Sequence, residues 1–299
     1  MINGIINIRK EKGYTSHDVV AKMRGILKQK KIGHTGTLDP DATGVLPVCL
    51  GHATKLCNLL TDRTKEYKTI LQLGIETDTQ DNSGTILAEK EVEVTQEQVR
   101  EVVKTFLGTT KQIPPMYSAI KINGQKLYDL ARQGKVVERE AREITITKLT
   151  LEKIDFPFVE LTVDCSKGTY IRTLCHDIGQ QLGCGATMTE LVRTRVGEFT
   201  LETAITLQEV ERLVSCHQIE ERVKSVTSFY ENLPFITPKK EFEKMLANGN
   251  PLYQNQVQQE ILLEDKEQVR VYNGTGNFCA IYSWNLKKHC YMPFQMFQT

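Results

Sequence analysis

The chain lacks the features that would place it in a membrane or direct it out of the cell. Across its 299 residues, no apolar run approaches the ~20 residues that a membrane-spanning helix needs. The short apolar stretch after Met1 ends in charged residues at Arg9–Lys12, so we expect no signal peptide. These absences predict a cytoplasmic protein without a membrane partner.

Cysteines at metal-binding spacing are also missing. The eight cysteines are scattered, no CxxC pair occurs, and the only adjacent Cys-His pairs are Cys175-His176 and Cys216-His217. Neighbouring side chains on a helix point in different directions, which makes both pairs poor chelates. We therefore expect reduced thiols and no metal site.

The chain also lacks an excess of charge of either sign. The chain has 38 Lys+Arg against 37 Asp+Glu, a formal net charge of +1. This total does not exclude a nucleic-acid partner, because partners respond to where charge lies. Residues 1–68 hold 12 Lys+Arg and 6 Asp+Glu, a net of +6, whereas the other 231 residues hold 26 and 31, a net of −5. The net charge is near zero because the positive N-terminal part and the negative remainder cancel.

Strand and helix patterns follow one another without a regular βαβ rhythm. Apolar alternation predicts strands at 67–74, 144–151 and 158–165. Ser16 is expected to cap an amphipathic helix with a cationic outer face, and Thr95 with Gln98 forms a capping box for another. This mixture favours an α+β fold with a mixed, mainly antiparallel sheet flanked by helices over a doubly wound parallel sheet.

The composition changes near Leu233-Pro234. A short helix is expected to start at Thr237-Pro238 and end at Gly249, and residues 268–273 with 278–284 resemble a hairpin. We therefore predict two domains, at 1–232 and 233–299, the second small and β-rich.

The most unusual segment runs from Gly33 to Pro47 and reads GHTGTLDPDATGVLP. Its glycines allow close backbone approach, and Pro40 holds Asp39 in an extended conformation. A fixed carboxylate near His34 suits a catalytic loop, but a structural loop in which Asp39 bonds local amides fits the residue types equally well. The segment lacks the Gly-Lys-Ser/Thr end of a P-loop, and no Gly-x-Ser-x-Gly nucleophile elbow occurs in the chain.

A second basic stretch extends from Lys111 to Arg142. It has seven Lys+Arg against three acids and contains Tyr117 and Tyr128. Cations track phosphates and aromatic rings stack on bases, so this composition suits RNA, although an ordinary solvated face would explain any single charge. Two basic stretches together with the Asp39 loop favour an enzyme that acts on RNA.

These residues resemble the TruB family of tRNA pseudouridine synthases. The resemblance covers about residues 1–200 and rests on motifs that occur in the family's order, namely Gly33–Pro47, Lys65–Lys68, Pro114–Ala119, Ser166–Arg172 and Leu191–Gly197. One departure is Lys10-Glu11, where the family often has Lys-Pro. The tail from about residue 233 resembles the family's PUA-like RNA-binding domain only loosely.

The resemblance implies a pseudouridine synthase fold and isomerisation of uridine 55, in the T loop of tRNA, to pseudouridine. No cofactor or metal is implied, and the expected partner of the monomer is the T arm of tRNA. The resemblance makes Asp39 the nucleophile, with attack at C1′ or at C6 both left open. It makes Arg172 the partner that keeps this carboxylate ionised, and Tyr67 the active-site tyrosine that stacks on the target base.

Three further residues match the family's substrate-binding positions. His34 would fill the space that the flipped-out uridine vacates, and Tyr170 and Leu191 would line the base pocket. Residues 121–142 match an insertion that closes over the RNA.

Two other function classes remain as alternatives from the residues. A non-catalytic RNA-binding protein could use the same basic surface, but it would not need the set of Asp39, Arg172 and Tyr67. A carboxylate-dependent hydrolase would need a second acid/base carboxylate, and Asp41, the closest in sequence, has no evident partner that would perturb its pKa.

Overall fold

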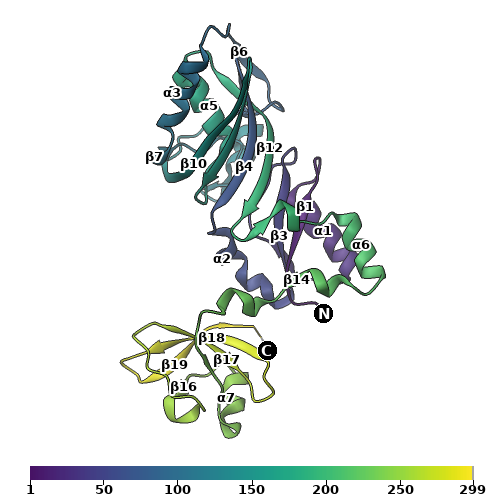
Figure 1. The fold of residues 1–299 in the computed structure, drawn as a ribbon, viewed down its shortest axis with the longest axis vertical. Helices are drawn as coiled ribbons and strands as arrows, with labels where there is room; N and C mark the ends of the chain where they lie inside the picture. Colours follow the sequence, from purple (N-terminus) through teal and green to yellow (C-terminus); the bar gives the residue numbers. More distant parts are fainter. Residues whose placement is uncertain (298–299) are drawn as a thin grey trace.

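Two β-sheets organise the chain, and they follow one another along the long axis of the molecule (Figure 1). The structure is a computed structural model that describes residues 1–297. No helix within this range is both long and apolar enough to span a bilayer.

The larger sheet has ten strands within residues 1–297. Its order is β14 (Val223–Lys224), β1 (Gly4–Lys10), β3 (Thr43–Leu50), β12 (Ala186–Val196), β4 (Lys65–Leu73), β11 (Phe158–Cys165), β10 (Arg142–Asp155) and β7 (Gly108–Gln112), with β2 (Ile32–His34) on β3 and β13 (Phe199–Thr200) on β12. The β3–β12 pair is parallel and the other named pairs of this sheet are antiparallel, so the predicted mixed, mainly antiparallel sheet is confirmed.

Helices α3 (Gln96–Thr105) and α5 (Ile171–Leu182) cover one face of the sheet at its upper end in Figure 1. Strand alternation turns the odd-numbered residues of β4 toward these helices, where Leu71 is fully buried beside Leu174 and Ile178 of α5. The predicted strands and the helix after Gly168 therefore form one apolar core.

Helices α1 (Ser16–Leu27) and α6 (Leu207–Ser215) cover the β1–β3 end of the sheet and contact each other. The prediction that Ser16 caps α1 is wrong, because Thr15 is the N-cap and forms a capping box with Asp18. Ser16 is the first helical residue, and its buried hydroxyl instead accepts a hydrogen bond from the backbone N–H of Leu38 at 2.9 Å. The side chain therefore serves the loop that carries Asp39.

The second sheet has five strands within the described residues: β15 (Phe235–Ile236), β17 (Gln268–Tyr272), β18 (Phe278–Asn285), β19 (Cys290–Met296) and β16 (Leu252–Tyr253). The predicted hairpin is confirmed as β17–β18. The predicted helix start at Thr237 is wrong, because α7 (Glu243–Ala247) begins later and follows a 3₁₀ turn at Lys240–Phe242.

Two 3₁₀ segments outside the larger sheet, Gly51–Leu56 and Val226–Tyr230, contact the C-terminal residues of the second sheet. Tyr230 packs against Phe278 and Phe297, and Lys55 donates from Nζ to the carbonyl oxygen of Met296 at 2.6 Å. The predicted boundary at residue 233 precedes the second sheet, and the division into two folding units stays a prediction.

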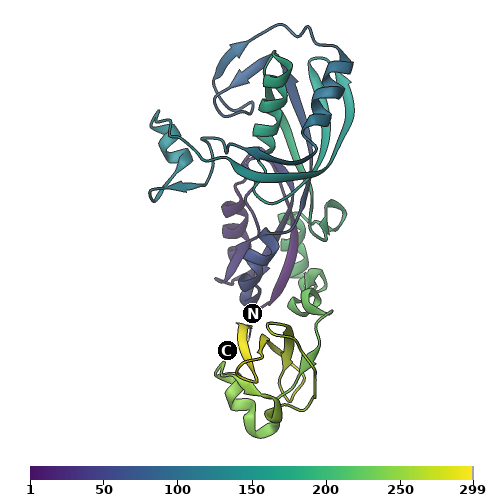
Figure 2. The ribbon, with the colours of Figure 1, turned by 90° about the vertical axis from the view of Figure 1, so that its left-hand side faces the viewer.

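The remaining short elements are two hairpins and several single turns. The hairpins are β5 (Ile75–Thr77) with β6 (Ile86–Glu89), and β8 (Lys121–Ile122) with β9 (Gln125–Lys126), which leads into α4 (Leu127–Arg132). Helix α2 (Cys57–Thr61) follows a 3₁₀ helix at Gly51–Leu56, and further 3₁₀ turns lie at Leu201–Thr203, Ile219–Arg222, Val226–Tyr230 and Gln254–Gln256. In Figure 2 the β8–β9–α4 segment projects from the body of the molecule as an arm.

The capping box of α3 gives a test of the fold that is separate from the site. Thr95 accepts a hydrogen bond from the N–H of Gln98, and the Gln98 side chain accepts one from the N–H of Thr95. We expect Thr95→Ala to lower the free energy of unfolding by about 1 kcal/mol, measured by urea denaturation. Thr95→Ser keeps the cap and serves as the control. Equal stability of the two variants would contradict the assigned cap.

Candidate active site

The loop between β2 and β3 is held in place from several sides. Lys10, at the end of β1, donates from Nζ to the carbonyl oxygens of Pro40 at 3.0 Å and Ala42 at 2.6 Å. The hydroxyl of Ser16 binds the N–H of Leu38. Ser16 thus fixes the backbone before Asp39, and Lys10 fixes the backbone after it. These bonds limit where the Asp39 carboxylate can point.

Arg172 in the first turn of α5 reaches the Asp39 carboxylate. Its Nε lies 3.0 Å from Asp39 Oδ2, and its Nη2 donates to Asp39 Oδ1 at 3.5 Å. The guanidinium also binds the carbonyl oxygens of Thr79 at 3.0 Å and Tyr117 at 2.8 Å. Since all three guanidinium nitrogens have acceptors, the buried charge is well compensated and its plane is fixed.

Asp81 is a second carboxylate beside Arg172, and the sequence did not indicate it. Its Oδ2 lies 3.4 Å from Arg172 Nη1, and its side chain is only 15 % exposed. Residues 78–84 are rich in turn-forming residues, and nothing in the sequence pattern indicated that this turn lies against the start of α5. Two carboxylates therefore share one guanidinium.

The pKa of Asp39 is raised above its ordinary value. Although 40 % of its side-chain surface is exposed, the protein packed around the carboxyl group is the main cause, because it penalises the charged form. The Arg172 guanidinium opposes this shift, while Asp81 adds to it. Arg172 is thus the strongest influence that favours the ionised form of Asp39.

Two more buried cations lie around the loop. Burial lowers the pKa of Lys10 to about 8, against the opposing influence of Asp39 and Asp41. Arg193 on β12 is 1 % exposed and donates from Nε to the carbonyl of Val45 at 2.7 Å and from Nη2 to that of Gly36 at 3.2 Å. Lys10 follows Ile6 and Ile8 at a spacing of two residues on β1. From this spacing the burial of Lys10 could have been predicted.

Tyr67 faces the same side of the sheet as Arg193, its register partner on β12. The ring is 7 % exposed, and burial raises the pKa of its hydroxyl, with Arg193 opposing the shift. Tyr67 therefore remains a neutral phenol whose ring packs with Leu38 and Ala42 of the Asp39 loop.

The three predicted substrate-binding residues lie on three different elements. His34 ends β2, its Nδ1 accepts a hydrogen bond from Gly36 N–H at 3.3 Å, and burial lowers its pKa. Tyr170 is the N-cap residue of α5, and Gln112 binds its backbone N–H and carbonyl at 2.8 and 3.0 Å. Leu191 is half-buried on β12 against the core that contains Tyr67. The roles of these residues stay predictions.

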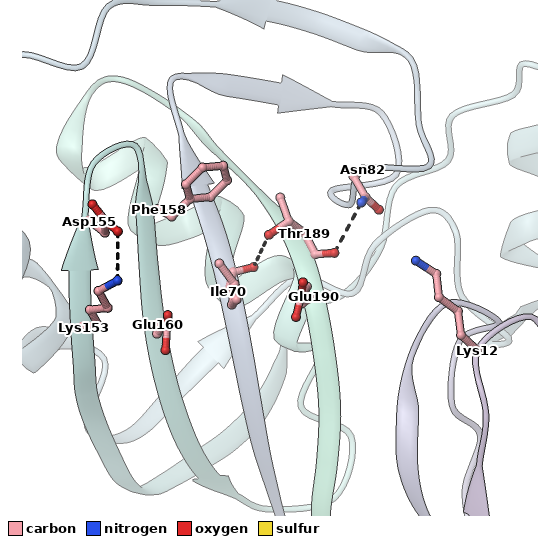
Figure 3. Close-up of a pocket in the computed structure, with 9 residues that line it drawn as sticks. All are labelled: Lys12, Ile70, Asn82, Lys153, Asp155, Phe158, Glu160, Thr189 and Glu190. Carbon is pink, nitrogen blue, oxygen red and sulfur yellow. Dashed lines mark hydrogen bonds and ion pairs between the residues drawn. The ribbon is translucent and has the colours of Figure 1, made fainter.

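A separate pocket of about 410 Å³ lies on the open face of the sheet (Figure 3). It includes Ile70, which alternation along β4 turns to the face opposite Tyr67. Its lining carries the acids Asp155, Glu160 and Glu190 and the bases Lys12 and Lys153, so it lacks the excess of cations that a phosphate backbone requires. Among residues 1–297 no group of three or more His, Cys, Asp or Glu side chains could hold a metal ion.

Two family models match consecutive parts of the chain. The TruB family pseudouridylate synthase N-terminal domain matches residues 24–171, and the tRNA pseudouridylate synthase B C-terminal domain matches residues 172–229. The boundary between the models falls inside α5, so both contribute strands to the larger sheet.

Curated relatives match over almost the whole chain. A tRNA pseudouridine synthase B of Lachnoclostridium phytofermentans is 51 % identical over 306 residues, covering 99 % of this chain and 100 % of the relative. One of Clostridium perfringens is 45 % identical over 282 residues, covering 94 % of each chain.

Solved structures show the same fold over 99 % of this chain. The structure titled as a Cbf5-Nop10-Gar1 complex matches with 27 % identity and a TM-score of 0.72, covering 85 % of that chain. A second, titled as an H/ACA RNP bound to a substrate RNA containing 2′-deoxyuridine, matches with 25 % identity and a TM-score of 0.70 over 85 % of that chain. The chain has the pseudouridine synthase fold with a β-rich C-terminal domain of the PUA-like kind.

The ion pair predicts how the Asp39 carboxyl group titrates. In the folded protein its midpoint should lie above the ordinary value of about 3.9, measured by carbon-13 NMR of labelled aspartate. Arg172→Gln removes the charge that favours the carboxylate, so the midpoint should rise further. Arg195→Gln, which removes a cation paired with Asp164, is the control and should leave it unchanged. A fall of the Asp39 midpoint in Arg172→Gln would contradict the assigned electrostatics.

Proposed function

This chain belongs to the TruB family of tRNA pseudouridine synthases, and from that premise we propose that it isomerises uridine 55 in the T loop of tRNA, with Asp39 as the nucleophile. Members of this family are isomerases that convert uridine in tRNA to pseudouridine. The single observation that carries the assignment of Asp39 is its ion pair with the buried Arg172.

The reaction moves one glycosidic bond within a single nucleotide. The bond between N1 and C1′ breaks, the uracil rotates while it is held, and C5 joins C1′ and loses its proton as N1 gains one. An ionised Asp39 attacks C1′ as the uracil leaves, or C6 of the ring, and both routes require the negative carboxylate. The protein supplies this through Arg172, which opposes the effect of burial on the pKa of Asp39.

The surroundings of Asp39 support a site for a flipped-out base. Tyr67 offers a neutral ring for stacking, and Tyr170 and Leu191 contribute the remaining walls. Extracting a base costs a few kcal/mol, and an aromatic pocket recovers part of that cost by stacking. His34, at the entrance of the loop, would take the place of the extracted uridine.

Cationic segments border this site and give the RNA a path across the protein. Helix α1 and the residues after it carry exposed Lys22, Lys28, Lys30 and Lys31, and residues 121–142 form the projecting arm (Figure 2). We assign the T arm of the tRNA to this surface. The projecting arm of the protein then closes over the bound RNA. The PUA-like unit at 233–299 is proposed as a second RNA contact of a monomeric, cytoplasmic enzyme.

Replacing the nucleophile should separate chemistry from binding. We expect Asp39→Asn to bind a T-arm stem-loop as tightly as the unchanged protein and to form no pseudouridine, measured by mass-sensitive nucleoside analysis. Asp41→Asn alters the exposed carboxylate two residues on and should remain active. Appreciable product from Asp39→Asn would refute the nucleophile assignment.

Salt dependence tests where the RNA lies. The triple change of Lys22, Lys30 and Lys31 to Ala should weaken binding and reduce the slope of log K against log salt by roughly one for each RNA phosphate that the protein no longer neutralises. Changing Arg100 and Lys104 to Ala on α3, at the far end of the sheet, is the matched control. An unchanged slope in the triple variant would place the RNA elsewhere.

A further inference from the structure

The projecting arm has its own small apolar core, and this core includes residues that precede the arm. Met116, Leu127 and Leu130 are buried together, with half-buried Tyr117 and Ile120 packed against them. This cluster is separate from the core that contains Tyr67 and α5. Residues 116–120 are therefore packed with the arm although they come before it in the chain.

Backbone hydrogen bonds join the same segment to the start of α4. Tyr128 donates its N–H to the carbonyl oxygen of Ser118 at 3.1 Å, and Leu127 donates to that of Ile120 at 2.8 Å. A displacement of α4 toward bound RNA would therefore move residues 118–120 with it.

The opposite side of this segment touches the catalytic arginine. Arg172 Nη2 donates to the carbonyl oxygen of Tyr117 at 2.8 Å, and the same nitrogen makes the longer, 3.5 Å bond to Asp39 Oδ1. The second of these lengths is at the outer limit of a hydrogen bond, so a small rotation of the guanidinium changes its strength steeply. The position of the Tyr117 carbonyl therefore affects how closely Arg172 holds Asp39.

Tyr117 also binds the turn that supplies the other acceptors of Arg172. Its hydroxyl donates to Asp78 Oδ2 at 3.1 Å, and the same turn provides the Thr79 carbonyl and the Asp81 carboxylate. Tyr117 is thus in contact with Arg172 through its backbone and with the turn around Arg172 through its side chain, while its ring packs in the core of the arm.

We propose that Tyr117 is a positioning residue that links RNA held by the arm to the Arg172–Asp39 pair, an inference that rests on the proposed function. RNA phosphates bound by Lys121, Lys126, Arg132 and Lys135 draw the arm inward. The shared core and the α4 hydrogen bonds carry that movement to the Tyr117 carbonyl. The 3.5 Å bond from Arg172 Nη2 to Asp39 Oδ1 then shortens when substrate binds, so that the guanidinium holds both carboxylate oxygens closely in the bound complex.

The test compares Tyr117→Phe, which removes only the hydroxyl, with Tyr230→Phe. Tyr230→Phe also removes a single hydroxyl, which donates to Gln295 Oε1 at 3.4 Å, and Tyr230 packs in an apolar cluster away from Arg172, with Phe199 and Phe297. We expect Tyr117→Phe to lower the single-turnover rate of pseudouridine formation about 3- to 10-fold at unchanged Kd for the T arm, as loss of one hydrogen bond implies. The Tyr230→Phe rate should equal that of the unchanged protein.

A second readout does not depend on turnover. The Nε–H resonance of Arg172 in nitrogen-15 NMR should shift when a T-arm stem-loop binds, and the shift should be smaller in Tyr117→Phe. An equal shift in Tyr117→Phe, or none in the unchanged protein, overturns the proposal whatever the rates are. Absence of pseudouridine from the unchanged protein would refute the proposed function, and the Arg172 resonance would still decide whether Tyr117 transmits binding.

Discussion

The active site depends on one buried guanidinium. Arg172 is held by Asp39, Asp81 and the carbonyl oxygens of Thr79 and Tyr117, which come from three separate segments of the chain. A carboxylate surrounded by protein tends to take up a proton, and the Arg172 guanidinium is the strongest influence that opposes this for Asp39. The same side chain therefore favours the ionised form of Asp39 and joins the Asp39 loop, the 78–84 turn and the segment before the arm.

The distribution of charge along the chain acquires a spatial meaning in the fold. The cationic residues of α1 lie near the Asp39 loop, whereas residues 86–101, with five acids and two bases, include β6 and α3 at the far end of the sheet (Figure 1). Asp78 and Asp81, from the turn before β6, lie at the site instead. This separation gives RNA an attractive side and a repulsive side, so orientation is favoured before any specific contact forms. The near-zero net charge describes neither side.

Much of the fold and two residues of the site could be predicted from the sequence, and the two contacts that were missed have different causes. Local patterns predicted the capping box of α3 and the β17–β18 hairpin, because these depend on residues close together in the chain. Motif resemblance indicated Asp39 and Arg172, which lie 133 residues apart and meet in the fold. Asp81 and the loop-holding role of Ser16 were missed, because the first depends on a turn that lies against the start of α5 and the second on a helix start shifted by one residue.

The central claim is that Asp39, ionised beside Arg172, isomerises one uridine of tRNA. The most direct test is to incubate the purified protein with full-length unmodified tRNA and to map every pseudouridine in the product at nucleotide resolution. We expect a single pseudouridine, at position 55. Pseudouridine at other positions only, or none at all, would contradict it.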